Sequence, residues 1–235
     1  MVLALGPLAG GITTVLGLGG GLMLVLVLQV IHGDPVVAMA IASPALMIGN
    51  AHRAWLFRRY LPLDAPTTRP WLIAVGIGAI IGGLGAVGLP PIVLKVGMAL
   101  AAGVAVLRQF GWLTSVPRPR FVAIAGLVVG LASTTGGAGL LAAPLLLSLG
   151  YEGHRYLALL SVSALVMHGG RILSFGALGA ITMDHLVLAC GLAIGIAVGN
   201  TVGRSIRERL SATVLSRLQS VTMMVMVALA LGGLR

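Results

Sequence analysis

The sequence contains little charge, one cysteine and very few acids. Asp, Glu, Lys and Arg together make up 9% of its 235 residues, and five of them are acidic. A soluble domain with 58% hydrophobic residues could not cover its surface with polar groups, so a soluble fold is excluded. The single Cys190 excludes an internal disulfide, and no His/Cys spacing suggests a metal site, so we expect no cofactor. The N-terminus has no basic region before its apolar run, so we expect no cleaved signal peptide.

What the chain does contain is a series of apolar runs. Most are about 20 residues long, the length that crosses a bilayer as a helix, and the alternation of a transmembrane barrel strand is missing. The mean hydropathy is +1.10. We therefore predict an all-α polytopic membrane protein with these apolar segments: Val2–Ile31, Val36–Phe57, Trp71–Leu89, Ile92–Phe110, Phe121–Leu149, Tyr156–Phe175, Leu186–Val202 and Leu215–Leu234.

The net charge of +10 has a topological explanation. The arginines cluster in loops between apolar runs, as in the positive-inside pattern of membrane proteins, so we expect a lipid bilayer and no nucleic acid as the partner. The arginines that follow Phe57 and Val202 should then both lie in the cytoplasm, and the protein in the inner membrane.

Two glycine clusters interrupt apolar segments. Each glycine disfavours a helix by about 1 kcal/mol relative to alanine, so consecutive glycines should break it. Irregular backbone at membrane depth is tolerated where it lines a cavity, and helix N-termini at such breaks attract anions. We expect the two breaks to face each other and form a substrate site, although close packing of helices also uses glycine. The glycines are Gly17, Gly19, Gly20 and Gly21 in the first segment and Gly136, Gly137 and Gly139 in the fifth.

The two clusters belong to an internal repeat. Sliding the chain on itself by 119 residues superimposes Gly17 on Gly136 and Gly20 on Gly139. This predicts two membrane repeats, residues 1–115 and 116–235. The arginine placement favours three crossings plus one broken or re-entrant helical hairpin in each repeat, which inverts the second relative to the first. Eight plain transmembrane helices are the alternative.

The repeated motifs resemble the TauE/SafE family of sulfite exporters and sulfonate permeases. The resemblance covers nearly the whole chain and implies transport of small sulfur-containing anions such as sulfite, thiosulfate or sulfonates. It rests on these stretches: Gly10-Gly11-Ile12-Thr13-Thr14 with Gly17–Gly21 and Ala40-Ile41-Ala42-Ser43 in the first half, and Gly130-Leu131-Ala132-Ser133 with Gly136–Gly139, Pro144-Leu145-Leu146 and Leu160-Ser161-Val162-Ser163 in the second.

Polar side chains inside the apolar segments are further candidates for substrate binding. Arg171 lies deep in a segment that runs outward, where the positive-inside rule does not explain an arginine. Arg53 can instead be explained by snorkelling to the interface, the hydroxyls by bonds to their own helices, and Asn200 by helix packing. The other candidates are Thr13, Thr14, Ser43, Asn50, His52, Ser133, Thr134, Thr135, Ser163 and His168.

The five acids all fall at or near loop ends, which argues against a carboxylate proton relay. Proton coupling would depend on His52 or His168. A uniporter, or a coupling ion such as Na⁺ held by backbone carbonyls, is the alternative, and the oligomeric state is open.

We predict a secondary transporter with no enzymatic activity. An anion channel with the same pore and a purely structural membrane subunit are the alternatives. An intramembrane serine protease is disfavoured because Ser43 precedes Pro44 and lacks the glycine context of a nucleophile elbow.

Overall fold

A computed structural model describes residues 2–17, 19–109, 121–135 and 138–232. All regular structure in these ranges is helical. The helices are η1 (Val2–Ala4), α1 (Leu5–Leu16), α2 (Gly20–His32), α3 (Pro35–Leu56), η2 (Arg58–Tyr60), α4 (Thr68–Ala86), α5 (Pro91–Gln109), α6 (Val122–Ala132), η4 (Ser133–Thr135), α7 (Ala138–Ser148), α8 (Gly153–Ala177), α9 (Met183–Arg207) and α10 (Ala212–Gly232).

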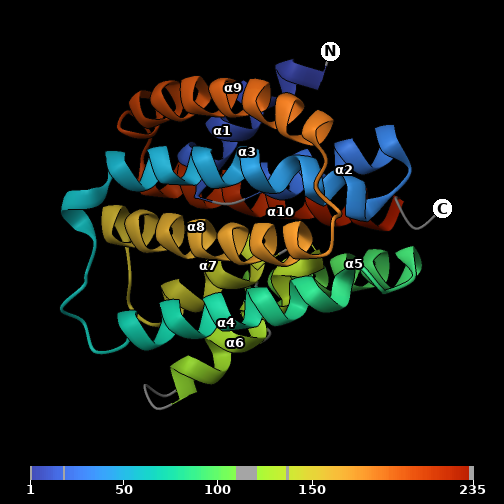
Figure 1. Ribbon diagram of the computed structural model, residues 1–235. Helices are drawn as coiled ribbons and strands as arrows, with labels where there is room; N and C mark the ends of the chain where they lie inside the picture. The colour runs from blue at the N-terminus through green and yellow to red at the C-terminus, as the bar shows by residue number, and fades with distance from the viewer. Residues whose placement is uncertain (1, 18, 110–120, 136–137, 233–235) are drawn as a thin grey trace.

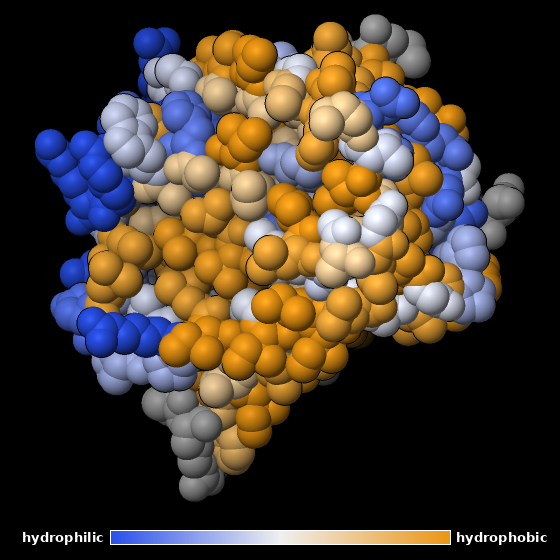
Figure 2. All heavy atoms as spheres, viewed as in Figure 1, coloured by the Kyte–Doolittle hydropathy of each residue, from blue (hydrophilic) through white to orange (hydrophobic). Residues whose placement is uncertain are grey.

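Four helices are long and apolar enough to cross a membrane, namely α3, α4, α8 and α9. They lie side by side with their axes roughly aligned (Figure 1). In the same view, apolar residues cover the middle of the molecule, and hydrophilic residues gather towards the two ends of the helices (Figure 2). This arrangement confirms the prediction of an all-α polytopic membrane protein.

The first glycine cluster interrupts its apolar segment as predicted. The helix α1 ends at Gly17, whose φ is 80°, and Gly19 has φ 91°, in the left-handed region that glycine adopts without strain. The helix α2 then folds back on α1, so closely that a Cβ on Gly20 would overlap the carbonyl oxygen of Ala9. The pair α1–α2 is therefore a helical hairpin rather than one bent span.

The second half contains a corresponding interruption. The helix α6 tightens into the short 3₁₀ helix η4, and the chain resumes as α7 at Ala138. The predicted break glycines Gly136 and Gly137 lie outside the described residues, and Gly139 lies in the first turn of α7. The helix order of the second half, α6 to α10, thus repeats that of the first half, α1 to α5.

Local sequence signals explain where the long helices begin. The Asp34 carboxylate accepts a hydrogen bond from the Val36 amide at 2.7 Å and caps α3, whose first residue is Pro35. Thr182 and His185 form a reciprocal capping box at the start of α9. The sequence predicted that this helix ends at Val202, but it continues to Arg207. Arginine is a good helix former, and its positive charge is favourable in the last turn of a helix.

Glycine stripes hold the two halves together in two tight helix pairs. In the first, α9 lies so close to α1 that a Cβ on Gly199 would stand 2.8 Å from the Gly11 nitrogen. In the second, α4 lies against α6, and a Cβ on Gly78 would stand 3.0 Å from the Gly130 Cα. In each pair a helix of one half is packed on a helix of the other, as small residues allow in membranes.

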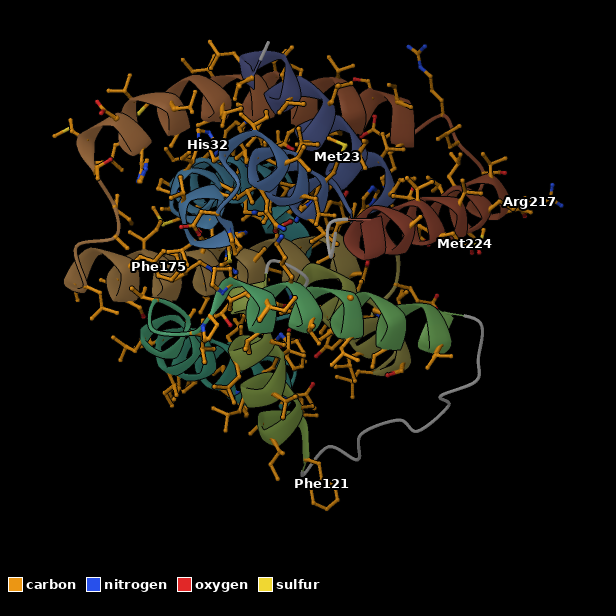
Figure 3. The ribbon with its side chains drawn as sticks, turned by 90° about the vertical axis from the view of Figure 1, so that its right-hand side faces the viewer. Met23, His32, Phe121, Phe175, Arg217 and Met224 are labelled. Carbon is orange, nitrogen blue, oxygen red and sulfur yellow. The ribbon has the colours of Figure 1, made fainter. Side chains whose placement is uncertain are left out.

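Arginines gather at the end of the bundle that is formed by the end of α3, the start of α8 and the end of α9. We call this the arginine-rich end. The His154 ring, at the start of α8, stacks on Tyr60 and Phe57 with centroid distances of 4.7 and 5.6 Å. The Arg204 guanidinium, near the end of α9, lies 5.9 Å from the Phe57 ring centroid. These contacts place the end of α3, the start of α8 and the end of α9 together. Arg217 on α10 points away from the bundle (Figure 3).

Candidate functional site

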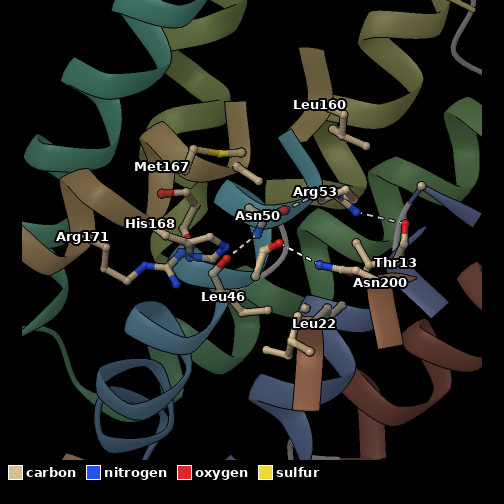
Figure 4. Close-up of a pocket in the computed structure, with 17 residues that line it drawn as sticks. Thr13, Leu22, Leu46, Asn50, Arg53, Leu160, Met167, His168, Arg171 and Asn200 are labelled. Atoms are coloured by element: carbon tan, nitrogen blue, oxygen red, sulfur yellow. Dashed lines mark hydrogen bonds between the residues drawn. The ribbon is translucent and has the colours of Figure 1, made fainter. Parts of the chain in front are cut away.

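A small cavity lies between the α1–α2 break, α3, α8 and α9. Its volume is about 60 Å³, several times the roughly 10–15 Å³ that one water molecule needs. One part of its wall is apolar, with Leu22, Leu46, Leu160, Met167 and Ile196. The polar groups that line it are Thr13, Asn50, Arg53, Ser133, His168, Arg171 and Asn200 (Figure 4).

Arg53 stands at one side of the cavity and is 2% exposed. Its Nε donates to the Ser161 hydroxyl at 2.7 Å and its Nη1 to the Thr13 carbonyl oxygen at 3.0 Å. Its Nη2 donates to the Asn50 side-chain oxygen at 2.7 Å. All three acceptors are neutral, so the guanidinium is positioned but its charge is not compensated.

Arg171 stands at the other side, next to His168, and is 1% exposed (Figure 4). Its Nη1 donates to the Ser43 hydroxyl at 3.1 Å, and its Nη2 donates to the Ser133 carbonyl oxygen. Its Nε is buried and has no partner among the described residues. A second guanidinium therefore faces the same cavity with neutral partners and an unused donor.

The two arginines are held in a reciprocal way. Arg53 on α3 binds Ser161 on α8, and Arg171 on α8 binds Ser43 on α3. The same 118 residues separate Arg53 from Arg171 and Ser43 from Ser161. Each arginine also binds a backbone carbonyl next to a helix break, at Thr13 or Ser133. Because α3 and α8 run in opposite directions and side chains lean towards a helix N-terminus, the two arginines lean towards the middle of the cavity.

No carboxylate neutralises this charge. All five acids lie at helix ends or in loops, and all are described: Asp34, Asp64, Glu152, Asp184 and Glu208. Within the described residues the one ion pair joins Arg204 to Glu208 at 3.0 Å, at the arginine-rich end. A buried, unpaired charge costs several kcal/mol even after relaxation, so an anion in the cavity would stabilise both guanidiniums.

Asparagine side chains tie the cavity wall together. Asn200 on α9 donates to the Gly49 carbonyl oxygen of α3 at 2.7 Å and accepts from the Thr14 hydroxyl at 2.7 Å. Asn50 donates to the Leu46 carbonyl oxygen at 2.7 Å while it accepts from Arg53. Asn200 therefore links α9 to α3 and α1, whereas Asn50 bonds within α3, and both asparagines line the cavity.

The comparison with protein families identifies the group to which this architecture belongs. The sequence model described as "Sulfite exporter TauE/SafE" matches residues 2–231, nearly the whole chain. The chain belongs to the TauE/SafE family. No curated protein and no solved structure matches it. Membership implies a sulfur-anion exporter or transporter with a small anion and the lipid bilayer as its partners, and a transporter family is consistent with the expectation of no enzymatic activity.

Within this TauE/SafE chain, the cavity brings together about half of the residues proposed from the sequence. Those that line it are Thr13, Gly17, Gly19, Gly21, Asn50, Arg53, Ser133, His168 and Arg171. Arg53 does not snorkel, because it is buried and each of its guanidinium nitrogens donates one hydrogen bond to the protein. Gly19 and Gly21 contribute the start of α2, where the first amides of a helix have no partner within it.

Other proposed residues lie outside the lining. Ser43 supports Arg171, and Thr14 binds Asn200. Ser163 accepts from the Trp71 indole nitrogen at 2.8 Å. His52 lies beside Trp55, with 6.3 Å between the ring centroids. Gly20 packs on Ala9, and the hydroxyls of Thr134 and Thr135 bond to carbonyl oxygens of α6.

The described residues of the two breaks reach the same cavity at different levels of α8. Gly17 lies against Tyr156 in the first turn of α8, whereas Ser133 binds Arg171, about four turns further along that helix. Residues 136 and 137 lie outside the described ranges, so the expectation that the two breaks face each other stays a prediction.

Two side chains next to the cavity were not among the candidates. Ser161 fixes Arg53, and its 118-residue spacing from Ser43 was a signal in the sequence that pairs it with a candidate. Tyr156 lies against Gly17, with its hydroxyl buried. It stands one turn into α8, and no sequence pattern distinguished it from an interface aromatic.

Proposed function

We propose that this protein transports a small sulfur-containing anion, such as sulfite, thiosulfate or a sulfonate, through the cavity between Arg53 and Arg171. The observation that carries the proposal is the pair of buried guanidiniums with neutral partners on one cavity. A charge-assisted contact to either guanidinium is stronger than a neutral hydrogen bond, and the asparagine amides and the start of α2 add further donors. The apolar part of the wall suits an organic group or a sulfur atom.

The proposal includes two inverted repeats, residues 1–115 and 116–235. The reciprocal pairs Arg53–Ser161 and Arg171–Ser43 support it, since a two-fold axis exchanges equivalent contacts between its halves. The two tight pairs, α1 with α9 and α4 with α6, support it in the same way. Binding near the middle of the membrane, between repeats with broken helices, is the plan of many secondary transporters.

The orientation follows from charge. The arginine-rich end lies in the cytoplasm by the positive-inside rule, and the membrane is then the inner membrane. Arg53 is the guanidinium nearer to the cytoplasm, and Arg171 the one nearer to the outside. Alternating access would expose them in turn.

If the cycle couples to protons, His168 is the group that would carry them, because it lines the cavity and His52 does not. The Nδ1 atom of His168 is buried without a partner among the described residues. Coupling to Na⁺ and uniport remain the alternatives to be separated by experiment.

Flux measurements in proteoliposomes test the proposal. We expect saturable uptake of at least one of sulfite, thiosulfate or a small sulfonate, abolished by Arg171→Gln and preserved by Arg217→Gln on the exposed side of α10. An absence of saturable flux for all three anions would contradict it. Flux that rises linearly with concentration would favour the channel.

A further inference from the structure

The Tyr156 hydroxyl is buried without a partner. Tyr156 is 1% exposed, and its hydroxyl oxygen has no hydrogen bond among the described residues. The nearby Tyr151 shows the contrast, since its hydroxyl lies 2.7 Å from the Thr67 hydroxyl and 3.1 Å from that of Thr68. Buried polar groups in proteins are nearly always satisfied, so an exception needs an explanation. A ligand that accepts from the hydroxyl provides one.

The space around this hydroxyl is created by the first break. A Cβ on Gly17 would lie 2.8 Å from the Tyr156 Cε1 and 3.2 Å from its hydroxyl oxygen. Any larger residue at this position would therefore displace the phenol. Because Gly17 also lines the cavity, Tyr156 stands at the end of the cavity nearest the arginine-rich end.

Two cations act on the same hydroxyl. Arg53 and Arg207 both lie close enough to Tyr156 to interact with it electrostatically. Arg207 is partly exposed, and it donates to the Val15 carbonyl oxygen just before the break. Its neighbour Glu208 binds Arg204 instead, so no acid neutralises Arg207 within the described residues.

These groups form a series that leads from solvent into the protein. Arg207 is partly exposed, Tyr156 is buried behind it, and Arg53 lies next in the cavity wall. We propose that the Tyr156 hydroxyl and the Arg207 guanidinium form a second anion subsite on the cytoplasmic approach to the cavity. It takes the same small oxyanion, which accepts from both groups before it moves to Arg53. This subsite rests on the proposed function, and two sites in series let an anion enter and leave a deep cavity.

The test separates capture of the anion at this subsite from its binding in the cavity. The initial flux from the cytoplasmic side is measured in vesicles of known orientation, at a limiting concentration of thiosulfate. The measurement is repeated from low to high ionic strength. We expect about a 10-fold loss of flux in Arg207→Gln and in Tyr156→Phe. Affinity at the cavity, read from thiosulfate-dependent thermal stabilisation, should change less than about 2-fold. The flux of the native protein should fall as salt rises, and that of Arg207→Gln should fall much less steeply.

Controls distinguish this role from a structural one. Arg207→Lys should keep the salt dependence, and Tyr151→Phe should keep the native flux. Native flux in Tyr156→Phe, or an unchanged salt dependence in Arg207→Gln, would overturn the subsite and leave the proposed function standing. Absence of stabilisation of the native protein by sulfite, thiosulfate and a small sulfonate alike would instead overturn the proposed function, and the subsite with it.

Discussion

Removing the charge of Arg171 should weaken anion binding without weakening the fold. In Arg171→Gln the cavity loses one of its two guanidiniums, and no acid is left unpaired by the change. An anion about 5 Å from that charge loses about 3 kcal/mol at an effective dielectric constant of about 20. This corresponds to an increase in Kd of about 100-fold.

The same variant should be at least as stable as the native protein when no anion is present. Arg171 is 1% exposed and its described partners are a hydroxyl and a carbonyl oxygen. Burying an uncompensated charge costs several kcal/mol, and a neutral amide avoids most of that cost. Weaker anion binding together with equal or higher stability without anion is what we expect of an arginine that is kept for function at the expense of stability.

Thermal unfolding in detergent, with and without anion, measures both effects. At an anion concentration of 100 times the native Kd, the native protein gains about 2.7 kcal/mol. With Kd raised 100-fold, Arg171→Gln gains about 0.4 kcal/mol. Arg171→Lys keeps the charge but loses the planar fork, so it should fall between the two. A variant that melts lower without anion, yet keeps the full anion-dependent gain, would refute the reasoning and make Arg171 a structural link between α8, α3 and η4.

Three further outcomes are expected. Ser43→Ala and Ser161→Ala each remove one acceptor from an arginine, so each should cost about 1 kcal/mol of anion affinity, and the two losses should match; unequal losses in titrations would argue against equivalent arginines. Gly199→Leu should destabilise the fold by about 3 kcal/mol in unfolding experiments, because its side chain has only the backbone of α1 to occupy. Cysteines placed at Asp184 and Arg207 in a Cys190→Ser background should label from opposite sides, since α9 separates them; labelling from one side contradicts the inverted topology.

Periodic and compositional signals predicted the fold well. Long apolar runs placed the spans, and consecutive glycines placed the first break at Gly17 to Gly19, where positive φ values occur. These features depend on local sequence, which is why they could be predicted. The packing of α1 on α9 could not, because it depends on how the glycines of the two helices register with each other.

The candidate site was predicted only in part for a similar reason. Arg171 stood out because the positive-inside rule could not explain it, whereas Arg53 had a simpler explanation near a helix end. Only the packed structure shows that Arg53 turns inward to Ser161 and Thr13. Tyr156 had no signal at all, since a buried hydroxyl without a partner is a property of the three-dimensional surroundings.

The central claim is that an anion binds between Arg53 and Arg171. An experimental structure determined with a saturating, transported anion tests it most directly, and selenite as a heavier analogue of sulfite would make the site unambiguous. The account predicts one anion in the cavity, within hydrogen-bonding distance of at least one of the two guanidiniums. A transported anion bound elsewhere, with the cavity closed and both arginines still on their serines, would contradict it.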